Sequence, residues 1–145
     1  MSAADLAAAD GLAAARAWLL SHPGVTAALG GPDRVGPRNE PPFPRVRLTD
    51  SPGTDRDLRW LLATDMTVHV LGDYDGTPGK AELRRILYTV LGALTELPSA
   101  DQSGAGVPIV TSVISTAGGG WSPEPSGQPR YVASVRVYIH PPFPS

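Results

Sequence analysis

The side chains that could bind a metal ion are few and poorly spaced. His22, His69 and His140 are the only histidines, and no two of them have the spacing of metal ligands. The chain contains no cysteine, which excludes disulfides, thiolate metal sites and cysteine nucleophiles. We therefore expect no metal site and no cofactor, and we interpret His69 as a solvated residue of a strand.

Three short motifs are reminiscent of ligand-binding loops, and each lacks a required residue. Asp73-Tyr74-Asp75-Gly76 resembles the start of a calcium loop, but the position that should supply the final glutamate is Arg84. Gly79-Lys80 is followed by Ala81 rather than serine or threonine, so the phosphate-binding pattern fails. Gly118-Gly119-Gly120 has neither the spacing nor the following helix of a dinucleotide fingerprint. The sequence predicts turns or bends at all three.

Acid–base catalysis has one weak set of candidates. Asp55, Asp57 and Asp65 could form a carboxylate pair only if a hairpin brought them together. Because charged loop residues are usually solvated, we expect no catalytic residues and no enzymatic activity. The alternative is a small oligomeric enzyme or ligand-binding domain, which a cavity containing His69 with Asp65 would support.

Aromatic residues in proline- and glycine-rich segments suggest protein–protein contacts instead. Trp60 and Trp121 lie at strand or loop edges, and Phe43 and Phe143 each stand in a Pro-Pro-Phe-Pro sequence. Such side chains often anchor interfaces. The alternative is that they cover the ends of a small sheet. The two interpretations are balanced for Trp60, whereas for Phe143 we favour a contact.

Composition limits the class of protein. The 145 residues fit one domain, and a net charge of −2 argues against a strongly basic nucleic-acid binder. No apolar run approaches the roughly 18–20 residues that span a bilayer. No lysine or arginine precedes Arg16 and there is no long apolar segment before it, so we predict no secretory signal and expect a soluble intracellular protein.

Two helices are expected to position these residues. Ser2–Ser21 is rich in alanine, has a capping-box spacing at Ser2 and Asp5, and is ended by His22-Pro23. A short helical turn could follow over 23–29. A second helix is predicted from the N-cap Thr77, with Pro78 in its first position, to about Glu96. Its apolar residues recur with helical spacing: Leu83, Ile86, Leu87, Val90, Leu91 and Leu94.

Four strands are expected, two before the second helix and two after it. Alternation predicts an antiparallel hairpin of Phe43–Asp50 and Trp60–Leu71. Val107–Thr116 is β-branched and is interrupted by Ala117–Gly120, and Arg130–His140 alternates again. One face of the predicted sheet is polar and carries Arg45, Arg47, Asp65, Thr67, His69 and Arg136.

The element order α-β-β-α-β-β predicts the fold class. We expect a single α+β domain over residues 1–140, with a four- to five-stranded, mainly antiparallel sheet and two helices packed on one of its faces. The remaining residues, 141–145, should form an extended proline-rich tail.

Four pieces of sequence, taken in order, point to a known family. They are the helix and turn of Ala17–Gly31, the proline-introduced strand Phe43–Leu48, the strand Met66–Asp73 with the long helix after it, and Gly120–Val132 with its alternating strand to His140-Pro141. In this order they resemble the tail terminator (tail completion) proteins of long-tailed bacteriophages, and Gly120–Val132 is the most specific piece. The chain departs from that pattern at Val70-Leu71, where an aromatic is usual, and in its Pro-Pro-Phe-Pro tail.

The resemblance implies a structural role in the virion. Tail terminators form a ring, typically a hexamer, at the head-proximal end of the tail tube. The ring ends tube polymerisation, contacts the head-side connector and lets DNA pass through its lumen. This implies a homo-oligomer in the tail or neck, assembled in the host cytoplasm, with the tube protein and the connector as partners and no membrane. A head–tail connector or adaptor subunit, which tends to be more helical, is the alternative.

Ring assembly leads to specific expectations for the surface. A ring needs head-to-tail interfaces that close. Since basic side chains in the lumen would hold phosphates, we expect a neutral or acidic lumen, with Arg45, Arg47 and Arg136 in subunit or tube contacts. The loop Asp50–Leu58 is predicted to contact the tube, and Ala117–Pro129 the next subunit or the connector. The candidate interface residues are Phe43, Arg45, Arg47, Asp55, Arg56, Trp60, Trp121, Arg130, Arg136 and Phe143.

Overall fold

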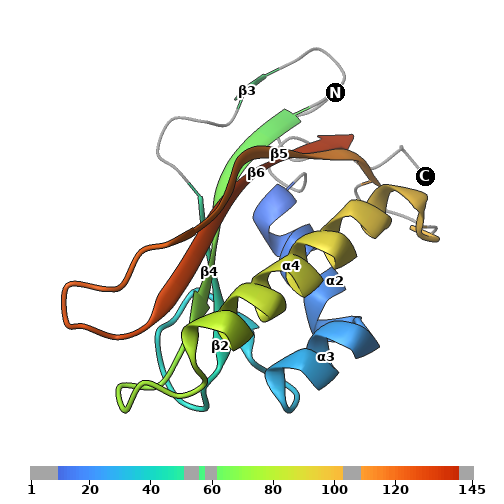
Figure 1. The fold of residues 1–145 in the computed structure, drawn as a ribbon. Coiled ribbons are helices and arrows are strands. Elements are labelled where there is room, and N and C mark those ends of the chain that lie inside the picture. Colours follow the sequence, from blue (N-terminus) through green and yellow to red (C-terminus); the bar gives the residue numbers. More distant parts are fainter. Residues whose placement is uncertain (1–9, 51–55, 58–61, 103–108, 141–145) are drawn as a thin grey trace.

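The structure of the chain is a computed structural model that describes residues 10–50, 56–57, 62–102 and 109–140. Three α-helices cover one face of a mainly antiparallel sheet (Figure 1). This is the α+β architecture predicted from the sequence, with a third helix added because the short turn over 23–29 is a helix of its own. No helix within these ranges is long and apolar enough to cross a membrane.

The first described helix, α2 (Gly11–Ser21), begins at a capping residue. Asp10 has extended backbone, and its side-chain carboxylate accepts a hydrogen bond from the Ala13 amide at 3.0 Å. The expectation of one uninterrupted helix over 2–21 is therefore wrong at Asp10. At the other end His22 leaves the helical conformation before Pro23, as predicted, and its ring caps the following helix α3 (Pro23–Leu29).

The long helix α4 (Lys80–Glu96) begins later than expected and continues into a 3-10 turn, η1 (Leu97–Ser99). Gly79 is its N-cap, so the assignment of Thr77 to this role is wrong. The hydroxyl and amide of Thr77 instead donate to the Asp75 carboxylate at 2.6 and 2.9 Å, so Thr77 belongs to the turn before the helix.

The sheet has the order β1-β2-β4-β6-β5. Its long strands are β2 (Arg45–Asp50), β4 (Leu62–Leu71), β5 (Ile109–Trp121) and β6 (Arg130–His140), and they pair antiparallel with one another. The two-residue β1 (Val35–Gly36) pairs parallel to β2, and β3 (Arg56–Asp57) pairs with the start of β4. The predicted hairpin is confirmed, with Arg47 opposite His69.

Strand β5 runs through the glycines that were expected to interrupt it. Its register against β6 shifts at three places, the last of them between Ala117 and Gly120. A Cβ at Gly119 would lie only 2.9 Å from Leu87 Cδ2 and 3.1 Å from the Tyr88 hydroxyl on α4. The absence of a side chain at Gly119 therefore lets the strand pass close to the helix instead of breaking the strand.

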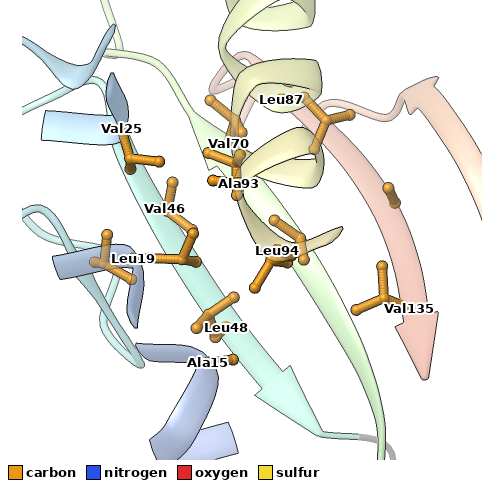
Figure 2. Close-up of a cluster of buried hydrophobic side chains, with 14 of the residues drawn as sticks. Ala15, Leu19, Val25, Val46, Leu48, Val70, Leu87, Ala93, Leu94 and Val135 are labelled. Atoms are coloured by element: carbon orange, nitrogen blue, oxygen red, sulfur yellow. The ribbon is translucent and has the colours of Figure 1, made fainter. Parts of the chain in front are cut away.

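The core lies between the sheet and the helices, where alternate strand residues meet the apolar stripes of α2 and α4 (Figure 2). On α4 the buried residues include Leu83, Ile86, Leu87, Val90 and Leu94, which confirms the predicted stripe, while Leu91 is half-buried. Each fully buried leucine contributes about 1.5–3 kcal/mol of transfer free energy. Among the described residues no helix lies on the other face of the sheet, and we call it the open face.

Candidate functional site

The open face is built from polar residues that neighbouring strands place side by side. Arg47 and Thr49 of β2 lie opposite His69 and Thr67 of β4. This follows from the strand period of two, which sends every second side chain away from the core.

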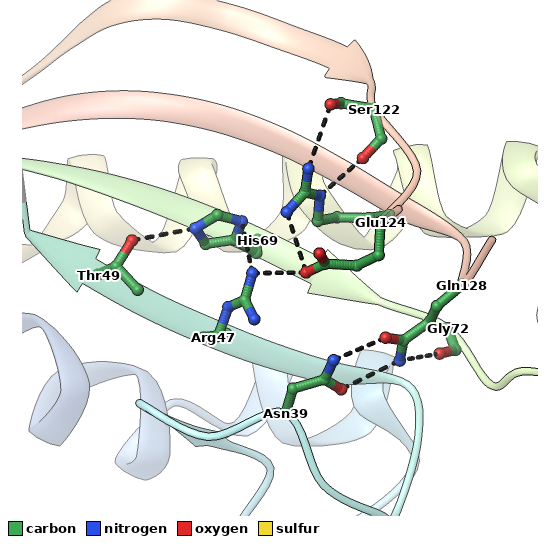
Figure 3. Close-up of polar contacts among 9 residues, drawn as sticks. Asn39, Arg47, Thr49, His69, Gly72, Ser122, Glu124 and Gln128 are labelled. Carbon is green, nitrogen blue, oxygen red and sulfur yellow. Dashed lines mark hydrogen bonds and ion pairs between the residues drawn. The ribbon is translucent and has the colours of Figure 1, made fainter. Parts of the chain in front are cut away.

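The densest part of the open face is a group that we call the Glu124 cluster, comprising Arg47, His69, Glu124 and Arg130. Figure 3 labels the first three of these residues. Arg47 Nη2 donates to Glu124 Oε1 at 2.7 Å, and Arg130 Nη1 lies 3.0 Å from the same oxygen. The three charged side chains are only 17–19% exposed. One half-buried carboxylate therefore pairs with two guanidinium groups from different strands and offsets half of their charge.

The loop between β5 and β6 delivers Glu124 to this position. The Glu124 amide donates to the Gln128 carbonyl at 3.0 Å, and the Gly127 amide donates back to the Glu124 carbonyl at 2.8 Å. Gly127 has a φ of 89°, a left-handed conformation in which glycine is favoured. Arg130 Nε also donates to the Ser122 carbonyl at 2.7 Å, which ties the two ends of the loop together.

His69 is buried rather than solvated, which corrects the prediction from the sequence. Its Nε2 lies 3.0 Å from Thr49 Oγ1 and its Nδ1 lies 3.5 Å from Arg47 Nη2. Because an arginine only donates, Nδ1 accepts and the neutral ring carries its proton on Nε2. Burial first, and then the charges of Arg47 and Arg130 against the weaker opposing effect of Glu124, lower the pKa of His69 from 6.5 to about 4.

The carboxyl of Glu124 is held in its charged form. Its burial would raise the pKa, but the hydrogen bond from Arg47 and the charges of Arg130 and Arg47 outweigh that effect, so the pKa is lowered. The Glu124 cluster is thus a pair of cations around one anion with a neutral histidine beside it at neutral pH.

A second ion pair lies farther along the same face. Arg136 of β6 donates through Nε to Asp65 Oδ1 at 2.6 Å and through Nη2 to Oδ2 at 3.2 Å, a two-point contact between residues that are register partners. The hydrogen bond to Asp65, with a further one to Tyr138, raises the pKa of Arg136. Since Asp65 faces Arg136 while His69 faces Arg47 and Thr49, the pairing of His69 with Asp65 that an enzyme would use is not formed.

Beneath the loop lies a buried amide pair that sequence reasoning missed. Gln128 is fully buried. It exchanges hydrogen bonds with Asn39 at 2.7 and 3.1 Å and donates to the Gly72 carbonyl at 2.8 Å. Neither residue type is distinctive in a loop. Gln128 and Glu124 do, however, fall in the Gly120–Val132 piece that carries the most specific resemblance, and this is the signal that could have singled them out.

The other candidate residues are dispersed over the described structure. The ring of Phe43 packs edge-on against Tyr74 at 6.1 Å. The ring of Trp121 packs on Tyr131 at 5.5 Å with Lys80 Nζ over it, yet the residue is 39% exposed. Arg45 was expected on the polar face in a contact with another protein. It is instead buried, and it hydrogen-bonds to carbonyls of its own chain.

For four of the candidate interface residues the structure gives no side-chain contacts. Asp55, Trp60 and Phe143 lie outside the described residues. The backbone of Arg56 belongs to β3 and pairs with Ala63. In the described parts of the chain no three histidine or acidic side chains come together as a metal site.

Comparisons with known proteins give a similarity of fold. A chain in the structure of the virion of a native gene transfer agent particle superposes on this one with a TM-score of 0.60 and 18% sequence identity. The match covers 96% of this chain and 99% of that chain, so the whole architecture is shared. No family model matches the sequence, and no curated protein matches it.

Proposed function

We propose that the protein is a structural subunit of a virion, and more specifically a tail terminator that forms a ring at the head-proximal end of the tail tube. The observation that carries the proposal is the end-to-end similarity in fold to a chain of a gene transfer agent virion. The order of sequence pieces noted above, which resembles tail terminators, supports the finer assignment. In this role the ring ends tube polymerisation and joins the tail to the head-side connector.

The charge on the open face supports a DNA conduit. Glu124 neutralises Arg47 and Arg130 in part, and Asp65 neutralises Arg136. Arginines that are already paired with carboxylates bind DNA phosphates weakly. Each phosphate contact that is not formed lowers the salt-dependent affinity of the surface for DNA. A lumen lined by such a face would let DNA pass without holding it. The proposal thereby moves Arg47 and Arg136 from the subunit or tube contacts expected from the sequence to the lumen.

Strand β5 supplies the surface proposed for the next subunit. It is the edge of the sheet, and none of its thirteen residues is charged. Ile114 and Trp121 on it are 45% and 39% exposed. Uncharged edges with exposed apolar side chains favour association with another chain. Contact of this edge with a different surface of the neighbour would give the head-to-tail interface that a closed ring requires.

The test is assembly in the presence of the cognate tube protein. The mass of the purified protein is measured by light scattering alone and with tubes, and tube lengths are measured by electron microscopy. A closed ring, formed alone or on tube ends, together with tubes of limited length supports the proposal. A monomer that leaves tube growth unchanged refutes it.

Substitution of Trp121 tests the proposed interface. Trp121→Ala removes an exposed ring whose contact with Tyr131 is worth about 0.5–1.5 kcal/mol, so we expect the monomer to fold and the ring to weaken. Tyr74→Ala is the matched control, because Tyr74 is also an exposed ring with one edge-on ring contact but lies in the turn before α4, away from β5. Global unfolding of the Trp121 variant, or equal loss of assembly in the control, would contradict the role given to Trp121.

A connector or adaptor subunit is the second candidate, and the secondary structure favours it less. Connectors tend to be helical, whereas this chain has described helices of 11, 7 and 17 residues and strands of up to 13 residues in one sheet. If the protein binds a head-side connector protein and has no effect on tube length, the result supports a connector or adaptor subunit over a terminator.

A further inference from the structure

A pocket of about 530 Å³ lies at the edge of the sheet opposite β5, between the start of α2, strand β1 and the segment 36–40. Its apolar wall includes Leu12 and Leu48, and its polar wall includes Arg16, Arg38 and Arg45. None of these side chains belongs to the Glu124 cluster. The combination of apolar and cationic walls sets this pocket apart from the ion pairs of the open face.

Arg45 is a buried cation with incomplete pairing. Its side chain is 8% exposed, and its Nη1 and Nη2 donate over long distances of 3.3 and 3.4 Å to the carbonyls of Glu40 and Asp33. Its Nε is buried without a hydrogen-bond partner. Among the described residues its ion-pair partner is Glu40, whose carboxylate oxygen is 3.9 Å away. A guanidinium group removed from water in this way is costly unless an anion approaches it closely.

Arg16 places a second guanidinium group beside the first. Its Nε donates to the Val35 carbonyl at 3.1 Å, and no carboxylate of the described residues pairs with it. A Cβ built at Gly36 would lie 3.6 Å from Arg16 Nε and 4.0 Å from Arg45 Nη2. Gly36 therefore sits between two cations and leaves the space of a side chain open between them.

The acidic residues at the pocket offset these cations only in part, since its lining has three arginines against Asp10 and Glu40. The Asp10 carboxylate accepts the Ala13 amide at the start of α2. The Glu40 side chain is about half exposed and lies 3.9–4.0 Å from Arg45 and Arg38, too far for a hydrogen bond to either. The pocket is thus a positive recess on a chain whose net charge is −2.

We propose that this pocket binds a carboxylate side chain on an acidic segment of a partner protein. A carboxylate between Arg16 and Arg45 would receive charge-assisted hydrogen bonds and would complete the pairing of Arg45. The apolar wall at Leu12 and Leu48 suits the methylene groups of a glutamate and the residues beside it. A phosphodiester backbone does not offer such a side chain. The inference rests on the proposed function only in taking the partner to be another protein of the virion.

The test uses a blocked oligoglutamate peptide as the probe and a duplex DNA oligonucleotide as the competing class of ligand. Binding is followed by calorimetry, and the Nε–Hε signals of the arginines are followed by NMR. We expect the peptide to shift the signals of Arg16 and Arg45, and Arg16→Gln to weaken its binding by about tenfold. Gly36→Ala fills the space between the cations and keeps their charge, so it should also weaken binding.

Arg84→Gln is the matched control, because it removes one positive charge from exposed α4 outside the pocket. The proposal is overturned if the peptide does not bind, if Arg84→Gln weakens binding as much as Arg16→Gln, or if only DNA binds. Tube capping is measured separately on the unaltered protein. Capping without peptide binding would overturn only the pocket, and peptide binding without capping would overturn only the terminator role.

Discussion

Replacement of Glu124 tests whether the Glu124 cluster holds the β5–β6 loop on the sheet. Glu124→Gln keeps the shape of the side chain and removes the charge shared by Arg47 and Arg130. A hydrogen bond to a charged group is worth about 1.5–3 kcal/mol, and the two bonds here measure 2.7 and 3.0 Å. The glutamine oxygen can still accept a hydrogen bond, so part of this stabilisation remains. Because the side chains are 17–19% exposed, water replaces another part of it. We expect a loss of about 2–3 kcal/mol in the free energy of unfolding.

Urea unfolding followed by circular dichroism measures this loss as a lower midpoint with an unchanged slope. The same loss should lower the melting temperature by roughly 10 °C for a chain of this size. Because Glu124 opposes the lowering of the His69 pKa, its removal should also move that pKa below about 4 in an NMR titration.

Glu82→Gln is the control, since it removes an equal charge from a solvent-exposed pair with Arg85 on α4. Its unfolding midpoint should stay where it is in the unaltered protein. The reasoning is refuted if Glu124→Gln unfolds with the midpoint of the control, because the two arginines would then be satisfied without the carboxylate.

Three further perturbations follow from the same structure. Gly119→Ala should destabilise the protein by about 1–3 kcal/mol, because the new Cβ would meet Leu87 at 2.9 Å, whereas Gly118→Ala has open space and should be neutral in the same urea assay. The folded-state pKa of His69, about 4, lies below the usual 6.5, so its contribution to stability is complete above pH 6.5 and is lost as the pH falls toward 4. Unfolding titrations should show up to about 3 kcal/mol lost over that window, and His69→Gln should remove this part of the pH dependence. Gln128→Leu should cost about 2–4 kcal/mol by thermal unfolding, since it leaves Asn39 and the Gly72 carbonyl without a partner; an unchanged melting temperature would contradict this pairing.

Periodic segments were predictable because their pattern is local. The stripe of α4, the alternation of β2, β4 and β6, and the turn at Asp73–Gly76 follow from spacing alone, and the structure confirms them. The exact helix starts were not predictable. Thr77 is engaged by Asp75 instead of capping α4, and Asp10 caps α2 within a stretch predicted to be continuously helical. These caps depend on particular hydrogen bonds that residue spacing does not show.

Some features of the candidate site could likewise be predicted from the sequence, and others depended on the tertiary structure. That residues 47, 69 and 136 share the open face follows from the strand period, which acts over a few residues. That Glu124 neutralises Arg47, that His69 is buried and neutral, and that Gly119 belongs to a strand all depend on residues brought together from distant parts of the sequence. By itself the sequence determined the apolar stripe of α4 and the strands β2, β4 and β6, because their patterns are local. Only the tertiary structure decided which charges are paired and which, at Arg16 and Arg45, are left facing a pocket, because pairing depends on distances between segments that periodicity does not encode.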